Sequence, residues 1–133
     1  MNSPLLNKIL LVEDEDDIRT IAKFTLEKYG KFKVEGCSSG EEALVLTESY
    51  LPDLILLDMM MPVMDGIETF KALKAKPKLK NIPVIFMTAK VQTHEIQQYK
   101  SMGVLGVITK PFSAVTLSDE IKTLWESQYE HSG

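Results

Sequence analysis

The sequence predicts an α/β protein with a doubly wound, five-stranded parallel sheet, and three observations lead to this fold class. Five short apolar runs suited to strands alternate with five stretches in which apolar residues recur at helical spacing. Four of the strand runs are almost continuously apolar, which is typical of strands covered on both faces. Five strand–helix units joined by right-handed crossovers give a three-layer sandwich.

The strands are predicted at residues 8–12, 32–36, 53–57, 83–87 and 104–108. The run at 32–36 alternates polar and apolar side chains, as a half-exposed edge strand does. The other four are the nearly continuous apolar runs that predict the buried part of the sheet.

Five helices are predicted from apolar side chains that share a face. We expect Pro77 to end the third helix, Gly103 to cap the fourth at its C-terminus, and Ser113 to be the N-cap of the fifth. The faces, in chain order, are Ile18, Ile21, Ala22 and Leu26; Ala43, Leu44 and Leu46; Ile67, Phe70 and Leu73; Ile96, Tyr99 and Met102; and Leu117, Ile121, Leu124 and Trp125.

Composition narrows the class of protein. A chain of 133 residues suits one compact domain, and its net charge of -4 argues against binding to nucleic acid or to an anionic membrane. No apolar run is long enough to span a membrane, and residues 1–8 lack the basic start of a secretory signal, so we expect a cytoplasmic protein. The single cysteine, Cys37, excludes an intrachain disulfide, and we interpret it as a structural residue.

Charged and polar side chains follow the predicted strands at the edge where open α/β sheets bind ligands. Glu13 and Asp14 follow the first strand, Asp58 the third, Thr88 the fourth and Lys110 the fifth. Two carboxylates about 4 Å apart repel by about 4 kcal/mol at an effective dielectric constant of 20. Such a cluster therefore needs cations, and Lys110 together with a divalent metal such as Mg2+ can supply them.

Asp58 is the candidate nucleophile. It follows four apolar residues, whereas Asp16 and Asp17 are explained by the preference for acidic residues in the first turn of a helix. A carboxylate can attack phosphorus to form an acyl phosphate, and alignment with charge neutralisation supplies most of the catalysis. Thr88 could otherwise simply end a strand and Lys110 could be a surface lysine, but their joint placement favours the phosphoryl-transfer interpretation.

Five stretches in order resemble the receiver domains of two-component response regulators, over about residues 7–127 of a single domain at 1–133. They are ILLVED at 9–14, PDLILLD at 52–58, MPVMDG at 61–66, VIFMTA at 84–89 and GVLGVITKPF at 103–112. The resemblance implies a flavodoxin-like (βα)5 fold with strand order 2-1-3-4-5. It also implies a phosphoprotein in a phosphorelay, which assists its own phosphorylation and slow self-dephosphorylation but is not an enzyme in the usual sense.

The resemblance assigns a role to each site residue. Asp58 would accept a phosphoryl group from a sensor histidine kinase or a histidine phosphotransfer protein. Asp14 and Asp58 would ligate Mg2+ (or Mn2+), Glu13 would act mostly through water, and the Met60 backbone carbonyl would complete the protein ligands. Thr88 and Lys110 would contact the phosphoryl group, with a cis Lys110–Pro111 peptide. A downstream protein would bind the surface of the fourth helix, fifth strand and fifth helix.

Two positions depart from the usual receiver pattern. Glu13 stands where aspartate is commoner, which affects metal affinity, and Val107 stands where many receivers carry an aromatic switch residue. Because valine is small and stiff, we expect Thr88 and the following loop, residues 88–95, to carry most of the response to phosphorylation.

Three other functions are weighed against the receiver. A haloacid-dehalogenase-type phosphatase would need a second aspartate where Met60 stands, and a flavodoxin-like FMN carrier would need a glycine-rich first loop, which is acidic here. A degenerate receiver that only binds partners is disfavoured because every expected site residue is present. Whether the chain acts alone or is the receiver of a longer protein stays open.

Overall fold

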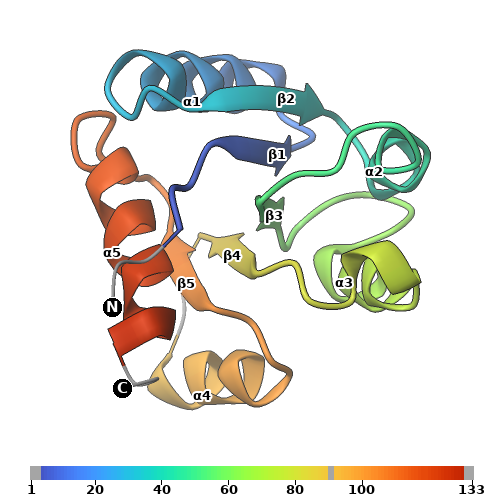
Figure 1. Ribbon diagram of the computed structural model, residues 1–133. Helices are drawn as coiled ribbons and strands as arrows, with labels where there is room; N and C mark the ends of the chain where they lie inside the picture. Colours follow the sequence, from blue (N-terminus) through green and yellow to red (C-terminus); the bar gives the residue numbers. More distant parts are fainter. Residues whose placement is uncertain (1–3, 90–91, 131–133) are drawn as a thin grey trace.

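The computed structural model describes residues 4–89 and 92–130, and it contains the predicted doubly wound parallel sheet (Figure 1). All strand pairs are parallel and the strand order is β2-β1-β3-β4-β5. Both the fold class and the order 2-1-3-4-5 are therefore confirmed. The strands are β1 (Lys8–Val12), β2 (Lys33–Cys37), β3 (Leu54–Asp58), β4 (Val84–Thr88) and β5 (Gly106–Thr109).

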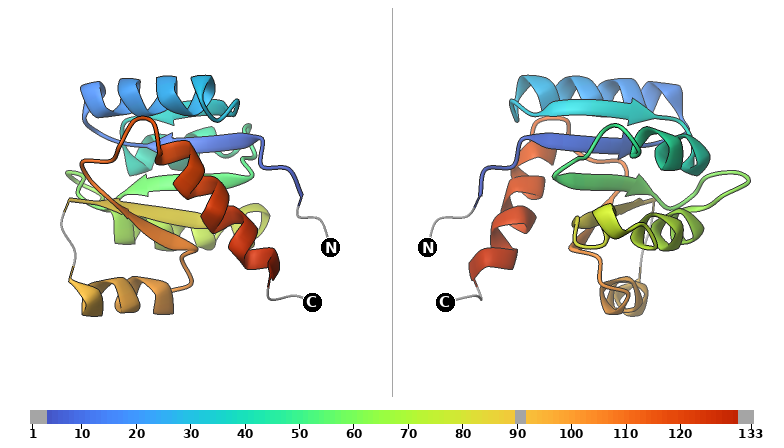
Figure 2. Two further views of the ribbon diagram at one scale, coloured as in Figure 1. Left: turned by 90° about the vertical axis from the view of Figure 1, so that its left-hand side faces the viewer. Right: turned by 45° about the vertical axis from the view of Figure 1, so that its right-hand side comes forward.

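In the part of the chain that the structure describes, α-helices cover both faces of the sheet (Figure 2). One apolar cluster joins the sheet to α1 and α5, and the other joins it to α2, α3 and α4. This division gives the three layers expected when both faces of a parallel sheet are covered. The helices are α1 (Asp16–Lys28), α2 (Gly40–Leu46), α3 (Gly66–Lys74), α4 (Thr93–Ser101) and α5 (Leu117–Glu130), with a short 3-10 helix η1 (Pro77–Leu79). In the described part of the chain, no helix has both the length and the apolar character needed to span a membrane.

Most helix-face predictions agree with the structure, but two details are wrong. Ile21 is 51% exposed, because the buried side of α1 passes through Ala22, Thr25 and Leu26 instead. Ser113 is not the N-cap of α5, since that helix begins at Leu117, whose N–H donates to the Ser113 carbonyl. A turn at residues 114–116 separates Ser113 from the helix.

The ends of two helices match expectation. Gly103 follows the C-cap of α4 with φ 98°, a left-handed conformation that glycine adopts at little cost. Helix α3 ends at Lys74, shortly before Pro77. Its start is also well defined, because Asp65 and Glu68 form a reciprocal capping box.

The N-terminal segment is fastened to the last helix. The indole N–H of Trp125 donates to the backbone carbonyl of Pro4 at 2.8 Å, and Leu6 packs against the same apolar cluster as α5. Trp125 is itself buried and its ring contacts that of Tyr129. Pro4 and Leu6 thus pack against α5 next to the amino ends of the strands, and this contact is called the joint below.

Candidate functional site

The carboxyl edge of the sheet gathers three carboxylates from two neighbouring strands. Val12 pairs with Leu57 across β1 and β3, so the residues that follow them, Glu13 and Asp58, come side by side. One oxygen each from Glu13, Asp14 and Asp58 lies within 4.8 Å of the others. The spacing of strands and loops therefore brings together the carboxylates singled out from the sequence.

Lys110 reaches into this cluster from the end of β5. Its Nζ lies 3.0 Å from Glu13 Oε1 and 3.1 Å from Asp58 Oδ1, and only 12% of its side chain is exposed. Its backbone N–H donates to the Thr88 carbonyl at 2.8 Å, which ties the loop to β4. The Lys110–Pro111 peptide is cis, as expected. A largely buried ammonium that bridges two carboxylates partly neutralises them.

The two oxygens of Asp58 differ. Oδ1 accepts hydrogen bonds from Lys110 Nζ and from the Met60 N–H, the latter at 3.2 Å. Oδ2 is buried and has no hydrogen-bond partner among the residues that the structure describes. A buried carboxylate oxygen without a donor is costly. Its position beside two further carboxylates fits an oxygen-seeking divalent cation such as Mg2+, so the site could bind a metal.

Burial and neighbouring charge shift two of these groups in opposite ways. Burial raises the pKa of Glu13 to about 7; hydrogen bonds from the Glu15 N–H and Lys110 lower it, while Asp58 raises it further. For Lys110, burial opposes the charged form, but hydrogen bonds and charges from Glu13 and Asp58 outweigh it and raise its pKa. Glu13 therefore changes charge near neutral pH, whereas Lys110 stays cationic.

The remaining predicted site residues flank the cluster. Thr88 is buried at the end of β4, one residue beyond the pairing of Met87 with Asp58. Met60 is 74% exposed and donates its backbone N–H to Asp58, so its backbone, and not its side chain, contributes to the site. Of the loop at 88–95 expected to respond to phosphorylation, residues 90 and 91 lie outside the described part of the chain.

Gly66 allows α3 to start directly against the end of β3. A Cβ at this position would lie 2.7 Å from the Asp58 carbonyl oxygen and 2.6 Å from the Met59 Cα, and both are backbone atoms. The Gly66 N–H also donates to the Met59 carbonyl. Any side chain here would push the helix away from the strand that carries Asp58.

The structure adds a residue that the sequence analysis missed. Arg19 Nη1 donates to the backbone carbonyl of Glu13 at 2.8 Å, and its Nη2 pairs with Asp16 Oδ1 at 2.5 Å. The spacing of Asp16 and Arg19 along a helix was a sequence signal for the ion pair. The bond to Glu13 depends on tertiary geometry and had no such signal.

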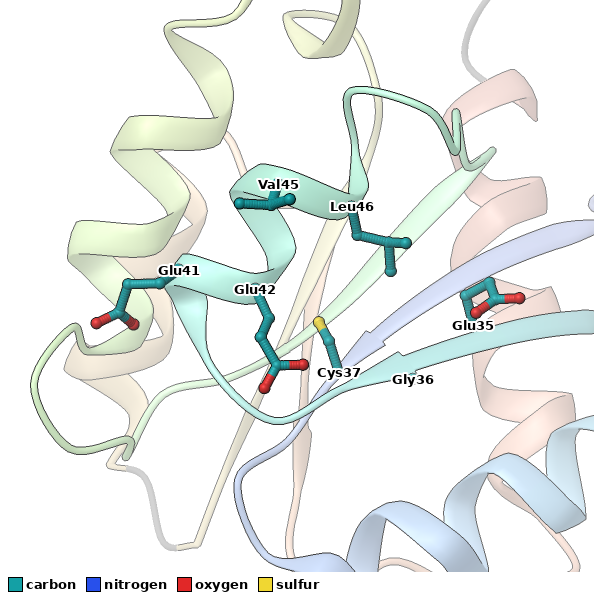
Figure 3. Close-up of a pocket in the computed structure, with 7 residues that line it drawn as sticks. All are labelled: Glu35, Gly36, Cys37, Glu41, Glu42, Val45 and Leu46. Carbon is teal, nitrogen blue, oxygen red and sulfur yellow. The ribbon is translucent and has the colours of Figure 1, made fainter.

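A hollow lies between the edge strand β2 and α2 (Figure 3). Cys37 lines it, and burial raises the pKa of this thiol to about 12. The thiol therefore stays protonated and is a poor nucleophile, in agreement with the structural interpretation of Cys37. The residues lining this hollow are Glu35, Gly36, Cys37, Glu41, Glu42, Val45 and Leu46.

Comparison with known proteins identifies the class to which this fold and site belong. Residues 9–122 match the family model of the response regulator receiver domain. The chain is 34% identical over 119 residues to chemotaxis protein CheY-3 of Vibrio cholerae, covering 90% of this chain and 92% of that protein. It superimposes on chemotaxis response regulator CheY4 of Vibrio cholerae with a TM-score of 0.82 and 31% identity, covering 90% and 99% of the two chains.

The chain therefore belongs to the receiver-domain family of two-component response regulators, as the sequence motifs indicated. Receiver domains are signalling domains that interact with histidine kinases and downstream targets. The chain is also 33% identical to the phosphate regulon transcriptional regulatory protein PhoB of Rhizobium meliloti, over 90% of its own length. It spans 52% of that relative and 48% of the alkaline phosphatase synthesis regulator PhoP of Bacillus subtilis, about half of each.

Proposed function

We propose that Asp58 accepts a phosphoryl group from a phosphohistidine of a sensor histidine kinase or a histidine phosphotransfer protein, in a reaction that depends on a divalent metal. The observation that carries this proposal is the buried Oδ2 of Asp58, which has no donor among the described residues, in a carboxyl group that lies beside two further carboxylates and pairs with Lys110 through Oδ1. The family of the chain supports the same interpretation.

The chemistry is a transfer between two nucleophiles. A carboxylate oxygen of Asp58 forms a bond to phosphorus while the phosphorus–nitrogen bond to the donor imidazole breaks, and the electron pair of that bond stays on the imidazole. The Lys110 ammonium would stabilise negative charge on the phosphoryl oxygens, and the Thr88 hydroxyl would donate a hydrogen bond to one of them.

Glu13, Asp14, Asp58 and the Met60 backbone carbonyl would hold Mg2+ or Mn2+. When bound, the ion would neutralise charge on the phosphoryl oxygens. Glu13 would act mostly through water, since one of its oxygens pairs with Lys110 and the other accepts the Glu15 N–H. With Glu13 titrating near pH 7, metal binding would strengthen as the pH rises and this carboxylate ionises.

The chain would act as a single cytoplasmic receiver domain that switches a protein-binding surface on α4, β5 and α5 and slowly dephosphorylates itself. The net charge of -4 argues against direct contact with nucleic acid or anionic membranes. Phosphorylation adds a charge of about -1.5 to -2, by analogy with other phosphorylated side chains. With Val107 at the usual aromatic position, Thr88 and the loop after it would carry the response.

Intact mass spectrometry after incubation with acetyl phosphate and Mg2+ tests the proposal. Wild type should gain the mass of one phosphoryl group, Asp58→Asn should not, and EDTA should prevent labelling of wild type. Asp53→Asn is the matched control, because Asp53 lies just before the same strand but at its opposite end. No labelling of wild type contradicts the proposal and leaves a receiver used only for binding. Equal labelling of Asp58→Asn contradicts it by placing the phosphoryl acceptor at another residue.

A further inference from the structure

Five consecutive carboxylates, from Glu13 to Asp17, form the loop after β1 and the first turn of α1, and this helix has no side-chain N-cap. Glu15 is the N-cap residue of α1, yet its side chain makes no capping hydrogen bond. Its N–H instead donates to Glu13 Oε2 at 3.1 Å. Repulsion within such a loop favours many conformations, so its observed shape needs other contacts.

Arg19 supplies a contact from the second turn of α1. One guanidinium nitrogen bonds to the Glu13 backbone carbonyl at 2.8 Å and the other pairs with Asp16. The methylene stem of Arg19 lies against Gly36 of β2, where an added Cβ would be 3.4 Å from Arg19 Cδ. Packing on the strand thus orients the guanidinium toward the loop.

The position of this bond matters for the next residue along the chain. The Glu13 N–H is held by the Cys37 carbonyl at 3.0 Å, and the Glu13 carbonyl is held by Arg19. Because a peptide unit is planar, fixing that carbonyl also fixes the nitrogen of Asp14. The peptide before Asp14 is therefore held by Arg19, and the peptide after it is held where the Glu15 N–H donates to Glu13 Oε2.

We propose that Arg19 is a positioning residue for the metal site, which acts on Asp14 through the Glu13–Asp14 peptide. This inference rests on the proposed metal-dependent function and extends it to a residue that touches neither metal nor phosphate. Arginine suits the task because its planar guanidinium holds two acceptors in fixed directions, which a lysine ammonium does not.

Electrostatics and positioning predict opposite signs when Arg19 is removed. Loss of a positive charge near a carboxylate cluster should by itself strengthen Mg2+ binding. Loss of a group that orients a ligand should weaken it, and changes behind metal ligands commonly cost about tenfold or more in affinity. The direction of the change therefore separates the two effects.

The test is calorimetric titration of the full chain with MgCl2 at pH 8 and constant ionic strength. We expect Arg19→Gln to weaken Mg2+ binding about tenfold, and Arg19→Lys to restore it only in part. Lys23→Gln is the matched control, since it removes the same charge and another ion pair of α1, that with Glu27 at 2.9 Å. It should leave Mg2+ affinity unchanged or slightly higher.

A second measurement keeps the test independent of stability. Circular dichroism at the titration temperature identifies the folded variants, and the 15N amide resonance of Asp14 in metal-free protein should move in Arg19→Gln and stay in Lys23→Gln. If Arg19→Gln does not fold, Arg19→Lys supplies the comparison. Arg19 variants that bind Mg2+ as tightly as wild type, or more tightly, overturn the role of Arg19 alone. A wild-type protein that binds no Mg2+ overturns the proposed function as well.

Discussion

Two aspartates bracket β3 and lie in opposite situations. Asp53, just before the strand, accepts hydrogen bonds on Oδ2 from the Asn7 N–H at 3.1 Å and the Lys8 N–H at 2.8 Å. Asp58, the last residue of the strand, is buried with an Oδ2 that has no partner in the described structure. The same type of side chain thus accepts two backbone hydrogen bonds on Oδ2 at one end of the strand and, among the described residues, none on Oδ2 at the other. The difference supports the proposed site at the carboxyl edge of the sheet.

The largest effect should come from removing the lysine at the carboxyl edge, and a lysine at the amino end supplies the comparison. Lys110→Ala would leave Glu13 and Asp58 without their cation and should lower the free energy of unfolding of metal-free protein by about 3 kcal/mol at pH 8. Lys8→Ala, at the exposed amino end, should change it by less than about 0.5 kcal/mol. Urea unfolding in EDTA measures both. Equal losses of unfolding free energy in the two variants would contradict the special role of Lys110 at the carboxyl edge.

The pH dependence of stability should also arise at the carboxyl edge. In the folded protein the pKa of Glu13 is about 7, above its ordinary value of 4.5, so the unfolded chain loses this proton first. Metal-free stability should therefore fall as pH rises from 4.5 to 7, by up to about 3 kcal/mol. Glu13→Gln should flatten this part of the profile, as followed by urea unfolding at a series of pH values. A wild-type profile that rises over this range would contradict the assignment.

Mg2+ should stabilise the carboxyl edge selectively. At a concentration one hundred times its dissociation constant, it should raise the free energy of unfolding by about 2.7 kcal/mol. Thermal melts with and without MgCl2 measure the shift, and Asp53→Asn should retain it while Asp58→Asn loses most of it. Absence of a shift in wild type would argue against a metal site.

The smallest expected effects are opposite in sign at the two ends of β3. Asp58→Asn should raise the stability of the metal-free protein by about 1 to 2 kcal/mol, because it removes carboxylate repulsion. Asp53→Ala should lower it by about 1 kcal/mol, because two backbone N–H groups lose their acceptor. Denaturant unfolding in EDTA compares them. A destabilised Asp58→Asn would indicate that Lys110 already balances the cluster.

Much of this contrast could be predicted from the sequence, because strand periodicity sets where the sheet ends. The strands predicted at 53–57 and 83–87 begin and end one residue too early, because β3 ends at Asp58 and β4 at Thr88. The polar residue after each apolar run still belongs to the ladder, since its backbone can pair whatever its side chain. The error left the order of charged groups along the sheet edge unchanged.

Other features depend on contacts between distant segments and could not be predicted. The bond from Arg19 to the Glu13 carbonyl needs the tilt of α1 against β2, which no residue spacing encodes. Helical spacing predicts Ile21 on the buried face of α1, but the helix turns that position outward and buries Thr25, whose hydroxyl donates to the Ala22 carbonyl. Sequence patterns identify which side chains are apolar or charged, whereas the packing of helices on the sheet decides which of them are buried or make contacts.

The joint between Pro4 and Trp125 has an optical consequence. Trp125 is the only tryptophan in the chain, and its indole nitrogen is tied to the first described residue. Indole emission therefore reports on this one joint, which lies at the amino ends of the strands. Asp58 lies at the opposite, carboxyl ends of the strands. Fluorescence then records opening of the joint, and the protein carries a built-in signal for unfolding at that end of the strands.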